Sequence, residues 1–425
     1  MMLKFPYGKG FLELDIPEVN LASVVESHSV KAAEDAEGEI VRALNNPIGS
    51  GRVEDLVKRE DRVALIVSDI TRPAPNQLMV PPILEALRKA GLREENLEII
   101  VANGLHRSPS RREMEELLGK RILEEAPLMN HDARDDEELV EAGRTSFRTR
   151  VTLNRRVVEA DSVIITGLIE PHFFAGYSGG RKSILPGIAG AESIFQNHSF
   201  RMIGHPKARY GILKGNPIHE DSVEAARFVK LKFMVNVVLN KERQIMKAFA
   251  GDFLRAHEAG VKFLEGLVKV PTPHRADIVV TTNGGYPLDR NLYQAVKGMA
   301  TGELVVKEGG VIIIMAECID GVEHMDFQRL MEGAKTPKEV LETIREKEPL
   351  GDQWEAQVLA RVLQRAEVIV VSKGVKDSII EDMLMTPAST PEEALNLALR
   401  KMGKNAKIVA VPEGPFVIPY VSSCT

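Results

Sequence analysis

The segment 170–187 holds the densest collection of residues that could take part in chemistry. It reads EPHFFAGYSGGRKSILPG, and its glycines permit a close approach between backbone and ligand and leave several N–H groups free. Arg181 and Lys182 add positive charge, and His172 supplies an imidazole that can gain or lose a proton near neutral pH. The segment could therefore hold an anionic ligand beside an acid–base group.

A nucleotide-binding P-loop is the first rival interpretation of this segment, and the spacing argues against it. A P-loop needs the pattern G-x-x-x-x-G-K-[ST]. Counted from Gly176, the sixth residue is Arg181 where the pattern requires glycine, and Lys182 and Ser183 follow it. We therefore do not expect a true P-loop.

Three of the ten histidines stand in distinctive local contexts: His106, His172 and His198. His172 lies between Pro171 and an aromatic pair, where the ring would be held and partly desolvated. The other seven have polar or loop-like surroundings, and we expect surface positions for His28, His131, His205, His219, His257, His274 and His324.

The elements that must position these residues follow a strand–helix alternation. Nearly continuous apolar runs, typical of strands buried on both faces, occur at residues 63–68, 97–103, 163–166, 233–239, 278–283, 311–316, 368–372 and 407–411. Helical patterns occur at residues 77–90, 110–118, 291–299, 354–365 and 391–402. This alternation predicts an α/β fold with mainly parallel sheets flanked by helices.

Polar or glycine-rich segments follow four of the predicted strands. They are SDITRP at residues 68–73, GLHR at 104–107, LIEPH at 168–172 and NGGYP at 283–287. In open α/β sheets, ligands bind beyond the carboxyl ends of the strands. We therefore expect these four segments to form the rim of one site.

Length and composition exclude several classes of protein. The chain has 425 residues and a net charge of -6, so it is long enough for two or three domains and offers no electrostatic reason to bind nucleic acid. Cys318 and Cys424 are its only cysteines, which excludes a disulfide framework and a four-cysteine metal site and favours a reducing cytoplasm. We see no signal peptide and no apolar run of about 18 residues, so we expect no membrane span.

The motifs together resemble a known family, the nickel-pincer lactate racemases and related 2-hydroxyacid racemases. The similar segments keep the family order: SDITRP, GLHR, EPHFFAGYSGGRKSILPG, QNHSF at residues 196–200, NGGYPLDRNLYQAVKGM at 283–299 and DQWEAQ at 352–357. They run from residue 68 to 357, and the long glycine–lysine motif is highly specific. The resemblance covers most of the chain.

The resemblance implies a cofactor and roles for particular residues. The family uses a pyridinium mononucleotide that carries nickel in a sulfur–carbon–sulfur pincer and is joined to a lysine, and Lys182 occupies the place of that lysine. His198 occupies the place of the nickel ligand, and one imidazole completing a sulfur-rich plane suits nickel(II). The implied cofactor contacts are Asp69, Gly176, Ser178, Gly179 and Gly180, of which Asp69 could instead orient Arg72.

The chemistry of a 2-hydroxy acid explains why such a site needs two histidines. The Cα–H is very weakly acidic because the neighbouring carboxylate is already anionic, so loss of hydride together with the hydroxyl proton is easier than direct proton abstraction. A transient 2-keto acid forms, and return of hydride to its other face inverts the centre. No side chain accepts hydride, so a cofactor must. His106 and His172 resemble the family's two acid–base histidines, one for each enantiomer.

The substrate carboxylate also needs anchors. Arg72 offers a planar fork that suits a carboxylate, although in isolation a surface ion pair would explain it equally well. Gln294 and Lys297 lie three residues apart on a predicted helix and can share a face with Tyr293. The resemblance favours substrate contact for these three. Trp354, the only tryptophan, matches a family position near the site, and a packing role explains it as well.

The resulting hypothesis is a two-domain enzyme, with residues 1–272 as the cofactor-binding and catalytic domain and residues 273–425 as a second α/β domain whose tail could return to the first. The site would lie in the cleft between them. We expect lactate as substrate, with malate, a longer aliphatic acid or a sugar acid as alternatives, and cofactor-synthesis and nickel-insertion proteins as partners. A phosphate-binding transferase and a non-enzymatic cofactor carrier are the rival classes.

Overall fold

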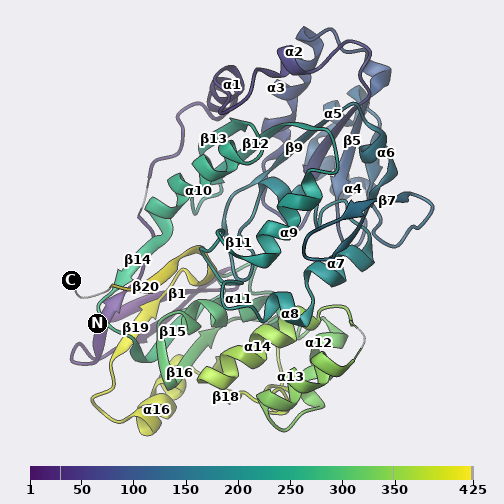
Figure 1. Ribbon diagram of the computed structural model, residues 1–425. Helices are drawn as coiled ribbons and strands as arrows, with labels where there is room; N and C mark the ends of the chain where they lie inside the picture. The colour runs from purple at the N-terminus through teal and green to yellow at the C-terminus, as the bar shows by residue number, and fades with distance from the viewer. Residues whose placement is uncertain (29, 348, 423–425) are drawn as a thin grey trace.

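The computed structural model describes residues 1–28, 30–347 and 349–422, so Cys424 lies outside the described residues. The chain forms two six-stranded sheets, one in each half of the elongated molecule (Figure 1). This architecture confirms the expected α/β fold with mainly parallel sheets flanked by helices.

The first sheet has the strand order β13-β12-β9-β4-β5-β6. Its strands are β13 (Ile245–Gly251), β12 (Leu231–Leu239), β9 (Ser162–Leu168), β4 (Val63–Ser68), β5 (Leu97–Ala102) and β6 (Leu128–Asn130). Neighbouring strands are parallel except for β13, which runs antiparallel to β12 at the edge. Loops after the carboxyl ends of β4, β5 and β9 therefore emerge on the same side of the sheet.

Helices cover both faces of the first sheet, which explains why its strands are continuous apolar runs. Leu65 and Val67 pack on one face, and Ala64 and Ile66 pack on the other. The first face carries α1 (Ala36–Asn45), α2 (Val53–Leu56), α3 (Asn76–Lys89), α4 (Arg111–Leu118) and α5 (Lys120–Glu125). The second face carries α6 (Arg155–Glu159), α7 (Ala191–Asn197), α9 (Pro217–Ala226) and the start of α10 (Arg255–Val268).

The second sheet is parallel throughout, with the strand order β18-β17-β16-β15-β19-β3. Its strands are β18 (Thr386–Ala388), β17 (Ala366–Val371), β16 (Val306–Met315), β15 (Ala276–Thr282), β19 (Ile408–Val411) and β3 (Leu21–Val24). One face packs against α11 (Leu292–Glu303), α12 (Met325–Glu332), α13 (Pro337–Glu346), α14 (Gln353–Arg365) and α15 (Asp377–Asp382). The other face packs against α16 (Pro391–Met402) and the hairpin of β1 (Met2–Tyr7) and β2 (Gly10–Asp15).

The N-terminal residues thus belong with the second sheet. The predicted division placed residues 1–272 together, whereas β3 pairs with β19 and the β1–β2 hairpin shares a core with the second sheet. In Figure 1 these purple strands lie among the green and yellow strands near the C-terminus. At the other end of the chain, β20 (Ile418–Val421) pairs in parallel with β14 (Lys269–Thr272), next to the predicted boundary.

Short elements complete the fold. Two hairpins, β7 (Leu139–Arg144) with β8 (Arg150–Asn154) and β10 (Pro171–His172) with β11 (Gly176–Tyr177), precede the short helix α8 (Phe200–Ile203). No helix in the described part of the chain has both the length and the apolar character needed to cross a membrane.

Candidate active site

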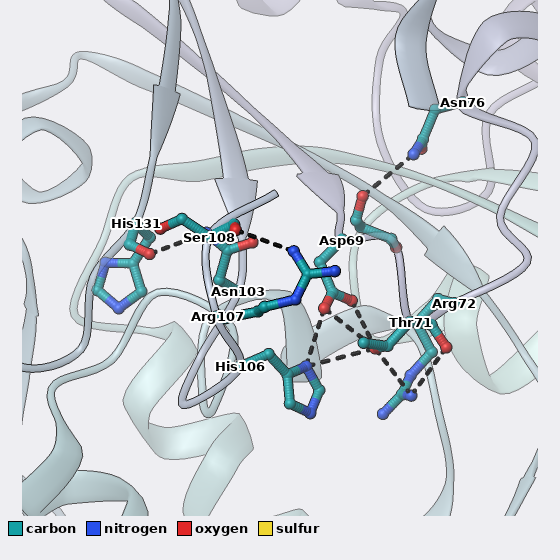
Figure 2. A network of polar contacts seen from close by, with 10 residues as sticks. Asp69, Thr71, Arg72, Asn76, Asn103, His106, Arg107, Ser108 and His131 are labelled. Atoms are coloured by element: carbon teal, nitrogen blue, oxygen red, sulfur yellow. Dashed lines mark hydrogen bonds and ion pairs between the residues drawn. The ribbon is translucent and has the colours of Figure 1, made fainter. Parts of the chain in front are cut away.

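Asp69 and His106 meet beyond the carboxyl ends of the adjacent strands β4 and β5 (Figure 2). Asp69 is buried, and its Oδ2 lies 2.8 Å from His106 Nδ1. The Thr71 hydroxyl donates to the same carboxylate, at 2.8 Å from Oδ1. The His106 side chain is 49% exposed, so its imidazole is oriented from one edge and accessible from the other.

Electrostatics keep this carboxylate ionised. Burial by itself would raise the pKa of Asp69, but the hydrogen bond from His106 and the nearby Arg72 guanidinium outweigh it, and the pKa is lowered. Arg72 Nη1 also contacts the Thr71 hydroxyl at 3.3 Å, and Figure 2 shows Arg72 beside this group. Asp69 therefore orients His106 and balances the charge of Arg72.

A second group gathers around the ring of Phe174. His172 lies edge-on to it with a centroid distance of 4.5 Å, and His198 lies edge-on at 5.0 Å. Lys182 Nζ lies 5.8 Å from the centroid of the same ring. His172 comes from the β10–β11 hairpin, Lys182 from a short helical turn after it, and His198 from the end of α7. One phenyl ring thus brings together three residues that the motifs singled out.

Arg181 explains the conformation of the loop that carries Lys182. Its side chain is buried, and it donates to the carbonyl oxygens of Ala175 at 2.9 Å, Tyr177 at 2.8 Å and Gly179 at 3.1 Å. These bonds fix the loop from the inside, while the neighbouring Lys182 side chain stays partly accessible.

The glycines of this loop pack closely against other parts of the protein. At Gly176, with φ of +80°, an added Cβ would lie 2.3 Å from the Ile212 carbonyl oxygen. At Gly180 the backbone N–H donates to Asn236 Oδ1 at 2.8 Å. Ser178 is similarly engaged, because its hydroxyl donates to the Leu168 carbonyl at 2.7 Å. Close packing within the chain is thus one reason for small residues here.

Desolvation and neighbouring cations set the protonation of the group around Phe174. Burial, followed by the charges of Arg181 and Arg72, holds the pKa of Lys182 well below its usual range. Burial and then the charges of Lys182 and Arg72 likewise hold the pKa of His172 well below its usual range. Burial lowers the pKa of His198 to about 3. At neutral pH the two imidazoles are therefore uncharged, and the Lys182 amine releases its proton far more readily than an exposed lysine does.

Helix α11 contributes Tyr293, Gln294 and Lys297 from the second sheet. Asn291 caps this helix by accepting a hydrogen bond from the Gln294 N–H at 2.8 Å. Lys297 Nζ donates to the Gln294 side chain and lies 5.9 Å from the ring centroid of Phe173. Lys297 of α11 thus lies beside the aromatic pair that follows His172.

Lys297 has a buried carboxyl group as its electrostatic partner. Glu355 of α14 is buried, and its Oε1 has no hydrogen-bond partner among the described residues. Burial and the Arg72 charge lower the pKa of Lys297 to about 8, against the opposing effect of Glu355. Burial raises the pKa of Glu355 to about 8, against the effect of Lys297.

One hydrogen bond and one electrostatic effect connect the group at Asp69 to the residues near Phe174. The Gly104 N–H, in the loop that carries His106, donates to the Gly187 carbonyl at 2.9 Å. The charge of Arg72 lowers the pKa values of three residues in the second group, which are His172, Lys182 and Lys297. The residues from the two halves of the chain therefore form one electrostatically coupled site.

Comparison with known proteins assigns this chain to a family. The model of the lactate racemase N-terminal domain matches residues 7–211, and that of the lactate racemase C-terminal domain matches residues 272–419. A lactate racemase from Thermoanaerobacterium thermosaccharolyticum is 41% identical over 98% of each chain. One from Lactiplantibacillus plantarum is 40% identical over 98% of this chain and 99% of its own.

The chain belongs to the lactate racemase family. The structure of the lactate racemase apoprotein from Thermoanaerobacterium thermosaccharolyticum superimposes with a TM-score of 0.94 and 40% identity, covering 99% of this chain and all of that one. A Thermotoga maritima protein, 19% identical with a TM-score of 0.67, shares the fold. The suspected family is therefore confirmed, and this chain is an isomerase of the racemase class.

Several residues of the candidate site could not be singled out from the motifs alone. Thr71 lies inside SDITRP, but only the structure reveals its bond to Asp69. Glu355 lies inside DQWEAQ, and its proximity to Lys297 follows from the packing of α14 against α11. Asn236, in the middle of β12, lies far from every motif.

The expectation that His131 and His257 lie on the surface is wrong. Both are buried, with exposed fractions of 1% and 2%. His257 Nε2 contacts the Ser178 carbonyl at 2.8 Å, and the His131 carbonyl accepts from the Asn103 side chain at 3.0 Å, as Figure 2 shows. Each therefore contacts a loop of the candidate site, a position that local polarity does not reveal.

Proposed function

We propose that this enzyme racemises a small 2-hydroxy acid, with lactate as the first substrate to test, using a nickel-pincer nucleotide attached to Lys182. The observation that carries the proposal is the grouping of His172, Lys182 and His198 around Phe174. The names of the full-length relatives support lactate as the substrate.

The residues present fit such a cofactor. Burial and the charges of Arg181 and Arg72 hold the pKa of Lys182 well below its usual range, which favours the unprotonated amine that an amide-type bond requires. His198 is buried, and its Nδ1 has no hydrogen-bond partner among the described residues. Within residues 1–28, 30–347 and 349–422, no three His, Cys, Asp or Glu side chains gather as a metal site. His198 would thus be the single protein ligand, and the cofactor would supply the remaining ligands and the capacity to accept hydride.

His106 and His172 are suited to act as the acid–base pair. His172 is uncharged because its pKa is well below the usual range, so it can accept the substrate hydroxyl proton. His106 is oriented by the buried Asp69 carboxylate, which accepts from Nδ1–H in one tautomer and leaves Nε2 to take a proton. Each histidine would act as base toward one enantiomer and as acid toward the other.

Cationic groups would anchor the substrate carboxylate while the reacting carbon inverts. Arg72 and Lys297 are close enough that the charge of Arg72 lowers the Lys297 pKa, so an anion between them would relieve their repulsion. The Gln294 amide lies on the same helix and would donate to the carboxylate. Tyr293, whose hydroxyl proton is directed to Asp352, would contact the substrate without donating to that carboxylate.

The proposal also implies other proteins. A pyridinium nucleotide with nickel must be synthesised and inserted before this chain can act, so cofactor-synthesis and nickel-insertion proteins are expected partners. We expect the whole process in the cytoplasm and without nucleic acid.

The decisive experiment is co-expression with cofactor-synthesis proteins and nickel, followed by intact-mass and peptide analysis. We expect a nucleotide-sized adduct on Lys182, stoichiometric nickel and interconversion of D- and L-lactate, with Lys182→Ala free of adduct. A panel of malate, longer 2-hydroxy acids and sugar acids would compare substrates. An unmodified lysine under conditions that load a known lactate racemase would refute the proposal, and nickel-independent turnover of ATP would favour a phosphate-binding transferase.

A further inference from the structure

Asp352, at the start of α14, uses neither carboxylate oxygen to cap its own helix. An aspartate at this position normally accepts a hydrogen bond from the second or third N–H of the helix. Here the side chain makes no such bond, and the backbone adopts a φ of +63°, in the left-handed region that few side chains favour. The carboxylate instead accepts from the Tyr293 hydroxyl at 3.1 Å and lies 2.9 Å from His324 Nδ1.

His324, which contacts Asp352, also contacts the Tyr293 ring directly. Its imidazole stacks on the Tyr293 ring with a centroid distance of 3.8 Å and an interplanar angle of 15°. The two rings and the Asp352 carboxylate therefore form a closed group drawn from three elements: α11, the residue before α12, and the residue before α14. Tyr293 is fixed at both its ring face and its hydroxyl.

The group determines what the Tyr293 hydroxyl can do. A carboxylate only accepts, so the phenol proton points to Asp352. The indole N–H of Trp354 donates to the phenol oxygen at 3.2 Å. The Trp354 ring in turn lies edge-on to His198, with a centroid distance of 5.2 Å and an angle of 74°. A continuous series of contacts thus runs from the half-exposed His324 to the buried His198.

We propose that His324 and Asp352 are positioning residues, which orient the Tyr293 hydroxyl as an acceptor for Trp354 and thereby hold Trp354 against His198. The catalytic part of this inference rests on the proposed function, in which Tyr293 contacts the substrate and His198 binds the metal. The orientation of Tyr293 and Trp354 by His324 and Asp352 concerns the chain alone and does not depend on the proposed function. The unused helix cap and the positive φ both disfavour this conformation of Asp352. Its contacts with Tyr293 and His324 compensate for that loss.

The test uses two substitutions that both tolerate a positive φ. Asp352→Gly removes both contacts. Asp352→Asn keeps them, because the amide oxygen can accept from Tyr293 and the amide nitrogen can donate to the other tautomer of His324. Since Trp354 is the only tryptophan, fluorescence of the cofactor-free chain reports on it directly. We expect a red-shifted emission for Asp352→Gly and wild-type emission for Asp352→Asn.

In the loaded enzyme we expect kcat/KM for lactate to fall about tenfold or more in Asp352→Gly and to stay within about threefold of wild type in Asp352→Asn. His324→Phe is a second variant, since it keeps a ring for stacking and removes one bond to Asp352. It should shift the emission and lower kcat/KM in the same direction, by less than Asp352→Gly.

Wild-type emission and activity in both Asp352→Gly and His324→Phe would overturn the inference, and so would equal losses in the Gly and Asn variants. If Asp352→Gly fails to fold, the emission and kcat/KM of His324→Phe decide whether the positioning role holds. If the wild-type chain loads no cofactor or leaves lactate unchanged, the proposed function fails, while the emission of the cofactor-free variants still decides the positioning role.

Discussion

Replacing Glu355 with glutamine should change the pH dependence of the enzyme rather than its maximal activity. Glu355 is buried beside Lys297, and the two side chains oppose each other's pKa shifts. Because its pKa is about 8, the Glu355 carboxyl ionises over the same pH range as Lys297, and the carboxylate that forms favours the protonated lysine. Glu355→Gln therefore removes the main group that keeps the Lys297 pKa from falling further. The variant lysine should lose its proton at a lower pH than the wild-type lysine, whose pKa is about 8.

The size of the effect can be worked through for a loss of about one pKa unit. An interaction of about 1.4 kcal/mol corresponds to about one pKa unit, which would take Lys297 from about 8 to about 7. At pH 7.5 the protonated fraction would then drop about threefold, from about 76% to about 24%. At pH 6 both forms would be about 90% protonated or more. If the cation binds the substrate carboxylate, kcat/KM follows these fractions.

The assay is the pH profile of kcat/KM for lactate with the loaded enzyme between pH 6 and 8.5. We expect kcat/KM of Glu355→Gln to decline on the alkaline side at a pH about one unit lower than in wild type. At pH 6 its kcat/KM should be close to that of wild type. Glu303→Gln is a matched control: it removes another carboxylate between α11 and α14, one that pairs with Arg361, and should lower Tm without moving the alkaline decline. A wild-type to Glu355→Gln ratio that stays constant across this pH range would refute the reasoning.

The remaining predictions concern the residues nearest the reaction. His106→Ala and His172→Ala should each lower racemisation by about 10²-fold or more while sparing the adduct on the lysine, and full activity in either variant, measured by chiral chromatography, would contradict the two-base scheme. His198→Ala should reduce nickel content, measured by elemental analysis, with little change in Tm, and a wild-type nickel content would remove it as the ligand. Asp69→Asn should keep the fold and lower kcat by about tenfold or more, because the amide can hold His106 in the wrong tautomer, and unchanged kcat would limit Asp69 to a packing role.

Much of the fold could be predicted from local pattern because strands buried on both faces have a distinctive composition. The run at residues 63–68 coincides with β4, and the helical pattern at residues 391–402 coincides with α16. The assignment of the N-terminal strands could not be predicted in this way. The strand β3 has only four residues, and a strand's pattern does not specify which sheet it joins.

The candidate site was partly predictable for a related reason. Residues at strand ends are recognisable as unusual, and motif order predicts site positions for Lys182, His106 and His172 from the sequence alone. The partners of these residues were not recognisable. Asn236 is a single polar residue in an apolar strand, and His324 sits in a loop with nothing to mark it, yet each makes a specific contact in the folded chain.

The sequence by itself determined the alternation of strands and helices, the loops that carry functional groups and the family to which they belong, because these depend on residue type and order. Tertiary structure alone decided the chemical state of those groups. Desolvation and charge act through space, so the pKa of Lys182 falls well below its usual range only where the folded chain buries the amine and brings Arg181 and Arg72 close to it. Likewise Asp69 orients His106 across 37 residues only because β4 and β5 are neighbours in the sheet.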